Sequence, residues 1–470
     1  MAPKLPPQPP LQHSTTAVAD GQSHGHAAPP KGIFRWLLTT NHKEIGTLYL
    51  IFSLTMFFIG GIFALVVRAE LFQPGLQLVE PEFFNQMTTM HGLIMVFGAV
   101  MPAFTGLANW MIPLQIGAPD MALPRLNNFS FWLLPVSFTL LLSTLLMPGG
   151  GPNFGWTFYA PLSTNFAPPS TTFFILALHI AGISSILGAI NIIATILNMR
   201  APGMRLMDMP LFVWTWLITA FLLIAVMPVL AGVITMMLMD INFGTSFFDA
   251  AGGGDPATAA IALLSFLVWA HHMFIVGLPL VAELFFMYST MLIAVPTGVK
   301  VFNWVTTLFR GSISFESPML FALAFVVLFT IGGFSGLMLA IAPAAIMAGV
   351  YYWLPKWTGH YPNEKLAQWH FWFSIIGVNL TFFPMHFAGL AGMPRRIPDY
   401  ALQFADFNLL SSIGAFFFGA SQLLFVLGVI LCVRGGKKAP AKAWEGAEDL
   451  EWTVPSPAPL HTFETPPVFH

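Results

Sequence analysis

Histidines inside apolar stretches are the residues of this sequence that first suggest chemistry. His91 lies in TTMHGLIMVF and His179 lies in LALHIAGISSILG. A neutral imidazole in such a setting can ligate a haem iron or form a hydrogen bond to a neighbouring helix. His271 and His272 are adjacent in VWAHHMF. Helical neighbours point about 100° apart, so both reach one metal only if it lies beside the helix or the helix unwinds locally. Imidazole suits Cu, Fe, Zn and Ni, which makes the pair a candidate metal site.

Two charged residues in or beside apolar runs are candidates for proton transfer. Lys300 lies deep in IAVPTGVKVFNW, with Thr297 one turn away. A buried lysine beside a hydroxyl group can relay protons, and the alternative is a lysine that snorkels to the helix end. Asp120 lies between NWMIPLQIGAP and ALPRLNN, next to a basic loop. A carboxylate at such a place can collect protons, or it can cap a helix.

Composition predicts that membrane helices position these residues. Of the 470 residues, 56% are hydrophobic and only 8% are charged, whereas a soluble chain carries about 25% charged residues. Most of the surface must therefore face lipid. The net charge of −2 argues against nucleic-acid binding. The single cysteine, Cys432, excludes an intramolecular disulfide, a thiolate zinc site and an iron–sulfur cluster.

Ten apolar stretches reach the length of about 20 residues that a membrane span needs. They are 45–67, 88–112, 130–147, 171–198, 210–238, 257–280, 283–309, 318–342, 369–391 and 407–433. A further apolar stretch, 344–354, is about half a span. We expect residues 1–33 to form a disordered cytoplasmic tail, 34–434 a membrane-embedded domain, and 435–470 a polar, Pro-rich C-terminal tail.

The positions of Lys and Arg between the spans predict that the N-terminus lies on the cytoplasmic side. Basic residues precede the first span and follow the second and the fourth. With five spans before 257–280, however, Arg310 would lie outside, so an odd number of helices is predicted to be missing just before residue 257. Arg395 and Arg396 also fall on an outer loop, and paired arginines there suggest an anionic ligand.

Several long motifs resemble subunit I of the haem–copper oxidases, and most closely the bacterial aa3-type cytochrome c oxidases. They include WLLTTNHKEIGTLYL, MIPLQIGAPDMALPRLNN, SSILGAIN, VWAHHMF, PTGVKVFNW, GLAGMPRRIPDY and LEWTVPSPAPLHTFETP. The resemblance runs from about Phe34 to Pro467. It implies an all-α membrane bundle of twelve helices that holds haem a, and haem a3 facing a copper ion, CuB.

The resemblance also implies the activity and the setting of the family. Its members reduce O2 to water with electrons from cytochrome c, which arrive through subunit II, and they pump protons. The implied partners are oxidase subunits II and III and the lipid bilayer, and the implied location is the bacterial inner membrane.

By position in these motifs, His91 matches an axial ligand of haem a, and His271 and His272 match two of the three CuB ligands. The residues that match other haem or active-site contacts are Arg68, Arg395, Arg396 and Trp156. The residues that match the D-pathway for protons are Asp120, Asn109, Asn127, Ser184 and Ser185. Lys300 and Thr297 match the K-pathway.

Two family segments have no counterpart in this sequence. After AGGGDP the family continues with a helix containing GHPEVY, whereas here Pro256 runs straight into ATAAIALLSF. That motif carries the third CuB histidine, a tyrosine cross-linked to it, and a glutamate of the D-pathway. After LAIAP the family has a stretch like HDTYFVVAHFHY, whereas here Ala344 joins directly to AIMAGVYYWLP. The haem a3 ligand, the second haem a ligand and Mg-site residues lie there.

With the ligands that remain, haem a would be five-coordinate at best and CuB would be two-coordinate. We therefore predict that the chain does not sustain oxidase turnover. Loss of one helix would also invert spans 257–342 unless the half-span re-enters. Three interpretations stay open. The chain is an oxidase subunit I that lacks two segments, a non-catalytic or single-haem membrane protein of the same descent, or a proton channel or transporter that uses Asp120 and Lys300.

Overall fold

The structure is a computed structural model. It describes residues 32–158, 160, 162–249, 252, 280–309, 311, 313–335, 341–463 and 465–468. At 289–297, 299–300, 331–335 and 341–344 only the backbone is described. Among the described residues the regular structure is helical, apart from one isolated β-bridge between His360 and Lys438. The predicted all-α architecture is therefore confirmed.

Most helices are long enough to cross a membrane. A short helix, α1 (Ile33–Leu38), lies in the N-terminal unit that ends at Thr39. The helices of the unit that begins at Thr40 are α2 (His42–Glu70), α3 (Pro81–Leu93), the π-helix η1 (Ile94–Val100), α4 (Met101–Ile116), α5 (Pro124–Ser143), α6 (Thr171–Asn198), α7 (Leu211–Phe243), α9 (Leu280–Leu308), α10 (Ser317–Ser335), α11 (Ile341–Thr358), α12 (Glu364–Leu390) and α13 (Ala405–Arg434).

Seven helical stretches, in the described part of the chain, are long and apolar enough to span a bilayer. They are α2, the continuous run Pro81–Ile116, α5 extended to Leu146, α6, α7, α12, and α13 with the turn that precedes it. They correspond to seven of the ten predicted spans. The predicted spans 283–309 and 318–342 are occupied by α9 and α10, and 257–280 lies outside the described residues.

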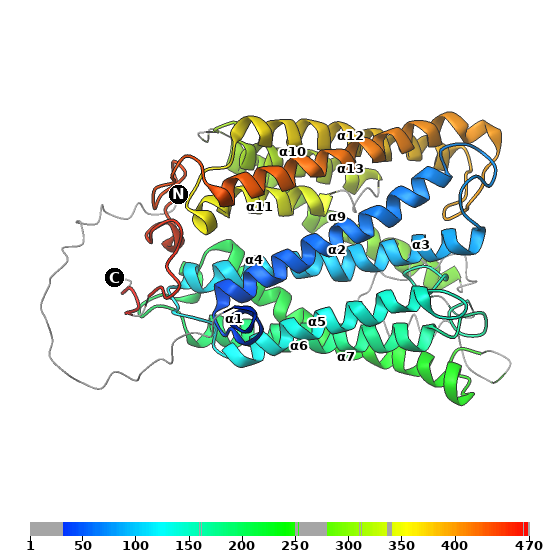
Figure 1. Ribbon diagram of the computed structural model, residues 1–470, viewed down its shortest axis with the longest axis horizontal. Helices are drawn as coiled ribbons and strands as arrows, with labels where there is room; N and C mark the ends of the chain where they lie inside the picture. Colours follow the sequence, from blue (N-terminus) through cyan, green and yellow to red (C-terminus); the bar gives the residue numbers. More distant parts are fainter. Residues whose placement is uncertain are drawn as a thin grey trace, which may run out of the picture. The chain divides into compact units, whose positions relative to one another are not determined.

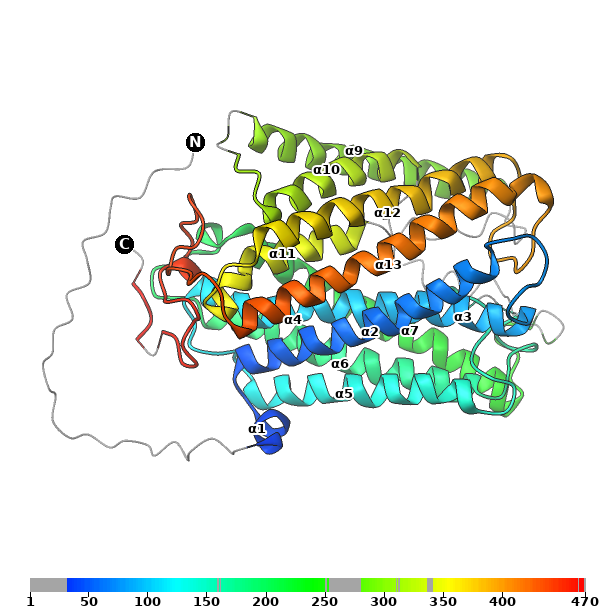
Figure 2. The ribbon, with the colours of Figure 1, turned by 45° about the horizontal axis from the view of Figure 1, so that its top comes forward.

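The central pair of the bundle is α2 and the run from α3 to α4. Figure 1 shows α2 against α4, with α5, α6 and α7 on one side and α10 to α13 on the other. The same order appears in the turned view of Figure 2. Because α2 touches both groups of helices, the residues on its different faces can line sites in either half.

Glycines allow α12 and α13 to approach each other at backbone distance. A Cβ added at Gly377 would lie 2.7 Å from the backbone nitrogen of Phe418, and one added at Gly414 would collide with the backbone nitrogen of Thr381. Small residues at such crossings are a common way for membrane helices to pack, because lipid supplies no hydrophobic drive between helices.

The C-terminal segment, residues 435–463 and 465–468, packs against one end of the bundle, which we call the Asp120 end. The ammonium group of Lys43, at the start of α2, donates hydrogen bonds to the carbonyl oxygen of Leu460 at 3.1 Å and to Oγ1 of Thr462 at 2.6 Å. At the end of α4, Nε2 of Gln115 donates to Oε1 of Glu451 at 2.9 Å. The predicted polar tail is thus bound closely to the membrane helices.

The start of α10 lies beside the start of α12. The amide and hydroxyl groups of Ser317, at the start of α10, donate to Oε1 of Glu364, at the start of α12, at 2.9 and 2.8 Å. Both helices therefore begin at the Asp120 end. Lys356 near the end of α11 binds the carbonyl oxygens of Ala441 and Val454 at that same end. Of the predicted spans 257–342, α10 thus begins at the same end as α12, and α11, which contains the half-span 344–354, runs back to that end. This arrangement agrees with the alternative in which the half-span re-enters.

Candidate functional site

His91 is held in an orientation that leaves one ring nitrogen available. It lies on α3, two residues before that helix ends at Leu93, and the wider π-helix η1 begins at the next residue, Ile94. Its Nδ1 lies 2.8 Å from the carbonyl oxygen of Gly60 on α2. A carbonyl oxygen can only accept, so Nδ1 carries the proton and Nε2 keeps its lone pair. Histidines that bind metals are commonly oriented in this way, by a hydrogen bond from the other nitrogen.

His179 lacks this freedom. Its Nδ1 lies 2.9 Å from the carbonyl oxygen of Ile175, and its Nε2 lies 2.9 Å from Oγ1 of Thr235 on α7. Both ring nitrogens are engaged within the α6–α7 pair. His179 is therefore a packing histidine. The sequence had left two alternatives open for it, a metal ligand or a hydrogen-bonded packing residue.

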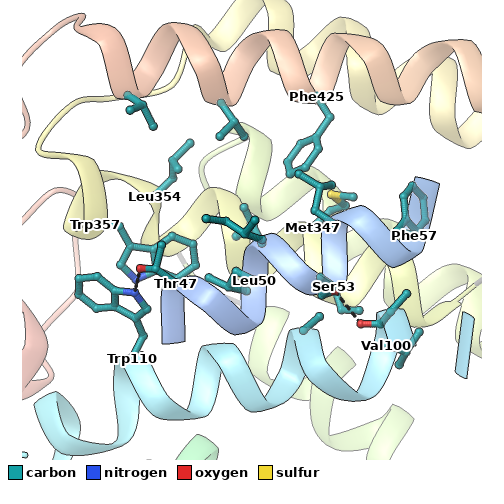
Figure 3. Close-up of a pocket in the computed structure, with 18 of the residues that line it drawn as sticks. Thr47, Leu50, Ser53, Phe57, Val100, Trp110, Met347, Leu354, Trp357 and Phe425 are labelled. Carbon is teal, nitrogen blue, oxygen red and sulfur yellow. Dashed lines mark hydrogen bonds between the residues drawn. The ribbon is translucent and has the colours of Figure 1, made fainter. Parts of the chain in front are cut away.

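A cavity of about 580 Å³ begins one helical turn beyond His91, at Met95. It runs between α2, α4, α11 and α13, as Figure 3 shows. Two polar groups in its wall have partners within the protein, whereas Nε1 of Trp357 has none among the described residues. Oγ of Ser53 donates to the carbonyl oxygen of Ala99 at 2.6 Å, and Nε1 of Trp110 donates to Oγ1 of Thr47 at 3.0 Å. A cavity of this size with an apolar wall suits the hydrocarbon part of a ligand.

Trp156 and Arg396 lie around the same turn of α3 as His91. A Cβ added at Gly92 would lie 3.2 Å from Cβ of Trp156, and one added at Gly155 would collide with Nη1 of Arg396. Arg396 has a φ of +62°, a left-handed backbone conformation that is rare outside glycine. The structure thus brings three predicted site residues to one corner. Arg395 is exposed.

Arg68 is bound to α13. Its Nη2 donates to the carbonyl oxygen of Asn408 at 2.7 Å and to Oγ of Ser412 at 2.9 Å. Its Nε donates to the same hydroxyl at 3.2 Å, and that hydroxyl donates to the carbonyl oxygen of Arg68 at 2.8 Å. In this structure Arg68 joins two helices, and its predicted contact with a haem stays a prediction.

A second set of predicted residues surrounds Asp120 in the loop between α4 and α5. Its Oδ1 accepts hydrogen bonds from the backbone amides of Met121 at 2.7 Å and His42 at 3.2 Å. Burial raises the pKa of the Asp120 carboxyl to about 6. These hydrogen bonds and the nearby charge of Lys43 act in the opposite direction, because they favour the ionised form. A carboxyl with that pKa exchanges protons near neutral pH.

A chain of polar groups leads from Asp120 into the bundle. Nδ1 of His42 lies 2.8 Å from the carbonyl oxygen of Asn109, and Nδ2 of Asn127 donates to Oδ1 of Asn109 at 2.6 Å. One turn further along α5, Oγ of Ser130 lies 3.1 Å from the hydroxyl of Tyr49.

The chain continues on α6. Oγ of Ser130 donates to the carbonyl oxygen of Ser184 at 2.8 Å, and Oγ of Ser184 donates to the carbonyl oxygen of Ser130 at 2.7 Å. Tyr49, Ser184 and Ser185 line a second cavity, of about 380 Å³, between α2, α4, α6 and α7. Among the described residues, those that line this cavity include no acidic or basic side chain.

Three members of this chain were missed in the sequence: His42, Tyr49 and Ser130. Tyr49 follows His42 by seven residues, so both lie on one face of α2. Ser130 follows Asn127 by three residues and shares its face of α5. Polar residues at helical spacing within an apolar run were the signal that marks them.

The remaining predicted site residues lie beyond the described side chains. His271 and His272 are outside the described residues. Lys300 and Thr297 belong to α9, where only their backbone is described. Their predicted metal-binding and proton-transfer roles stay predictions.

Comparison with known proteins agrees with the resemblance. The profile of the family "Cytochrome C and Quinol oxidase polypeptide I" matches residues 44–261, 256–347 and 343–417. Cytochrome c oxidase subunit 1 of Cereibacter sphaeroides is 41% identical over an alignment of 556 positions, which covers 96% of this chain and 98% of the relative. Cytochrome c oxidase subunit 1 of Synechocystis sp. is 41% identical and covers 91% of this chain and 90% of its own length.

Two further comparisons point the same way. The putative cytochrome c oxidase subunit 1-beta of Streptomyces avermitilis is 40% identical over 96% of this chain and 93% of the relative. A solved heme-copper terminal oxidase dimer has a similar fold, with a TM-score of 0.57 over 84% of each chain at 15% identity. The family profile, the identity to these relatives and the helical membrane fold together establish that the chain belongs to the cytochrome c and quinol oxidase polypeptide I family.

Proposed function

We propose that this chain is a haem-binding membrane subunit of an oxidase complex that does not by itself sustain oxygen reduction. The orientation of His91 carries the first part of the proposal. Its Nε2 keeps a lone pair because Nδ1 donates its hydrogen bond to the carbonyl oxygen of Gly60. A large apolar cavity begins one helical turn away. A haem bound there would supply electron-transfer chemistry. His91 would hold its iron, the cavity would take its apolar part, and Arg396 at the same corner would pair with its carboxylates.

The second part of the proposal rests on the two absent segments. The family profile matches in three consecutive pieces that meet at residues 256–261 and 343–347. These are the places where the sequence motifs put the gaps, at Pro256 and Ala344. The alignment with the Cereibacter sphaeroides subunit has 556 positions, 86 more than the 470 residues of this chain. At least those 86 positions (556 − 470) hold a residue of the relative and none of this chain.

Ligand counting gives the chemical consequence. With the GHPEVY and HDTYFVVAHFHY-like motifs absent, this chain offers CuB two histidines, His271 and His272, and offers haem a3 no matched axial ligand. Copper in such sites needs a third strong ligand, and four-electron reduction of O2 needs both metals together. The residues present do not fit a binuclear centre.

The residues around Asp120 support a proton-uptake role that is incomplete in this chain. Asp120 takes up a proton at the Asp120 end, and His42, Asn109, Asn127 and Tyr49 lead from it toward Ser184. The glutamate that continues this route in the family belongs to the absent GHPEVY segment. Protons therefore reach the second cavity without a carboxylate to receive them.

The finer setting follows the family. We infer that the chain lies in a bacterial inner membrane with its N-terminus on the cytoplasmic side and that it assembles with oxidase subunits II and III. Cytochrome c would donate electrons through subunit II. The Lys and Arg distribution supports the orientation, and the placement of Asp120 at the end that carries the basic loops agrees with proton uptake from the cytoplasm.

Haem content and oxygen uptake of the full chain, purified from membranes, test both parts. We expect at most one haem per chain, lost in His91→Ala and retained in His179→Ala, which removes a histidine of similar setting that lacks a free ring nitrogen. Oxygen uptake with reduced cytochrome c should equal that of His91→Ala. Two haems per chain, or uptake above the haem-free variant, would overturn the proposal. Proton flux through vesicles of the haem-free variant would instead favour a channel.

A further inference from the structure

The ammonium group of Lys43 is buried near Asp120 and yet is bound elsewhere. Lys43, at the start of α2, is 3% exposed. Its Nζ donates to the carbonyl oxygen of Leu460 at 3.1 Å and to Oγ1 of Thr462 at 2.6 Å, both in the C-terminal segment. It acts on the Asp120 carboxyl through its charge, without a hydrogen bond between the two side chains. Buried lysines are usually paired with an acidic group, so the C-terminal segment directs this one away from its nearby carboxylate.

The two oxygen atoms that bind the ammonium group are themselves held in place. The carbonyl oxygen of Leu460 also accepts from Nδ2 of Asn41 at 2.9 Å, and the same Asn41 caps the start of α2. Thr462 is 4% exposed. Further along the segment, Pro467 lies against the end of α4, because a Cβ added at Gly117 would lie 2.9 Å from Cγ of Pro467. The segment is therefore fixed to both helices next to the α4–α5 loop.

Lys43 and His461 are the ionisable side chains that act on the Asp120 carboxyl, from α2 and from the C-terminal segment. Both charges favour the ionised carboxylate, whereas burial opposes it. The ring of His42 on α2 is bound to a backbone carbonyl oxygen of α4, and Arg125 on α5 is exposed. A lysine carries its charge on a flexible four-carbon stem, so the distance of that charge from Asp120 depends on what binds the ammonium group.

We propose that Thr462 and the carbonyl group of Leu460 are positioning groups that hold the Lys43 ammonium away from Asp120, and so keep Asp120 able to exchange protons. The role rests on the proposed proton uptake at Asp120. An opposite charge within about 4–6 Å lowers the pKa of a carboxyl by about one to three units. Movement of the ammonium group from Thr462 toward Asp120 would therefore stabilise the carboxylate and carry its titration away from neutral pH.

The infrared carboxyl band of Asp120, identified by its absence in Asp120→Asn, gives the titration midpoint in the purified full chain. Thr462→Val removes the hydroxyl group and nearly keeps the shape of the side chain. We expect its midpoint to fall by about 0.5 to 1 pH unit, a part of the full effect of a nearby charge. Thr462→Ser should keep the wild-type midpoint. Thr465→Val, which changes an exposed threonine of the same segment, should keep it too.

A Lys43→Met background separates the position of the charge from a structural effect. Without the ammonium group, Thr462→Val should leave the midpoint unchanged. Loss of docking by the segment would instead shift the midpoint in this background as well, because His461 would leave the neighbourhood of Asp120. Limited proteolysis of the same samples reports whether the segment is docked.

The two proposals for Asp120 fail in different ways. A midpoint in Thr462→Val equal to or above that of the wild type, or a fall of the same size with and without Lys43, would overturn the positioning role while proton uptake at Asp120 stands. A wild-type midpoint near pH 4 would overturn the proton uptake and the positioning role together. None of these measurements depends on haem binding.

Discussion

Two histidines in similar apolar helices show how one hydrogen bond separates a candidate ligand from a packing residue. His91 gives only Nδ1 to the protein, to the carbonyl oxygen of Gly60, while His179 gives both ring nitrogens. The sequence presents both as histidines surrounded by apolar residues. What decides between them is the residue on the neighbouring helix, and no local pattern contains that information.

Gly60 is needed beside His91 for reasons of space. A Cβ at this position would lie 2.9 Å from Sδ of Met95 and 3.2 Å from Cγ2 of Ile94. We expect Gly60→Ala to push α2 away from η1, to weaken the His91 hydrogen bond and to destabilise the protein by about 1–3 kcal/mol, as overpacking does. Haem retention and thermal unfolding measure both effects.

Gly61→Ala is the matched control, because a Cβ at Gly61 meets nothing within 4 Å. It should be neutral or slightly stabilising, since alanine favours helix over glycine. Equal haem retention in Gly60→Ala and Gly61→Ala would show that the contact with Met95 does not matter.

The Asp120 carboxyl should titrate close to pH 6. Its pKa is raised above the ordinary value of 3.8, so the folded protein holds a proton that the unfolded chain has lost between about pH 4 and pH 6. The contribution of this group to stability is therefore full below that window and is lost as the pH rises through it. The infrared carboxyl band that disappears in Asp120→Asn gives the midpoint.

Lys43→Met should raise that midpoint further, because the Lys43 charge favours the ionised carboxylate. Lys442→Met, an exposed lysine of the C-terminal segment, should leave it unchanged. A midpoint near pH 4 in the wild type would mean that Asp120 is better solvated than the structure indicates.

Among the elements, hydropathy predicted most of the membrane helices and failed where packing decides the backbone. The predicted span 88–112 is shorter than the helical run that contains it, Pro81–Ile116. The prediction began too late because the first turns of α3 are polar. The π-helix η1 within it was not predicted. It packs against α2, and this contact joins residues far apart in the sequence, which no local hydropathy pattern contains.

The crossing of α12 and α13 should be intolerant of any side chain at its glycines. Gly377→Ala would place a methyl group 2.7 Å from the backbone of Phe418, which cannot move without shifting the helix. We expect a loss of about 1–3 kcal/mol or more, measured by denaturant unfolding in detergent. Gly389→Ala, in the same helix with nothing within 4 Å of its Cβ, is the control. An equal loss in both variants would point to helix flexibility instead of the crossing.

For the whole molecule, the least predictable feature was the C-terminal segment. Its composition predicted a polar tail, yet Glu451 and Trp452 are almost fully buried. The partners that bury them, such as Gln115 and Lys356, belong to helices hundreds or tens of residues away. By contrast, the route from Asp120 was largely predictable from the family motifs, because those motifs carry its residues one by one.

Docking of the C-terminal segment should weaken as the pH rises. Burial raises the pKa of the Glu451 carboxyl from 4.5 to about 7. The docked state therefore keeps a proton that the released segment loses, and docking loses on the order of 3 kcal/mol between about pH 4.5 and pH 7. Limited proteolysis of the segment against pH measures this.

Glu451→Gln should make proteolysis of the segment independent of pH over that window, because a neutral amide keeps the bond to Gln115 without a titrating proton. Glu448→Gln, an exposed neighbour, should keep the pH dependence of the wild type. Protection that grows with pH in the wild type would contradict the placement of Glu451 in a buried site.

The hydrogen bonds from Lys43 to Leu460 and Thr462 can form only late in synthesis of the chain. Leu460 and Thr462 are separated from Lys43 by 417 and 419 positions in the chain, so they are translated long after α2. Until they are translated, Lys43 has neither of these two partners to bind. A nascent chain arrested before residue 460 would therefore hold α2 without the two hydrogen bonds that join it to the C-terminal segment.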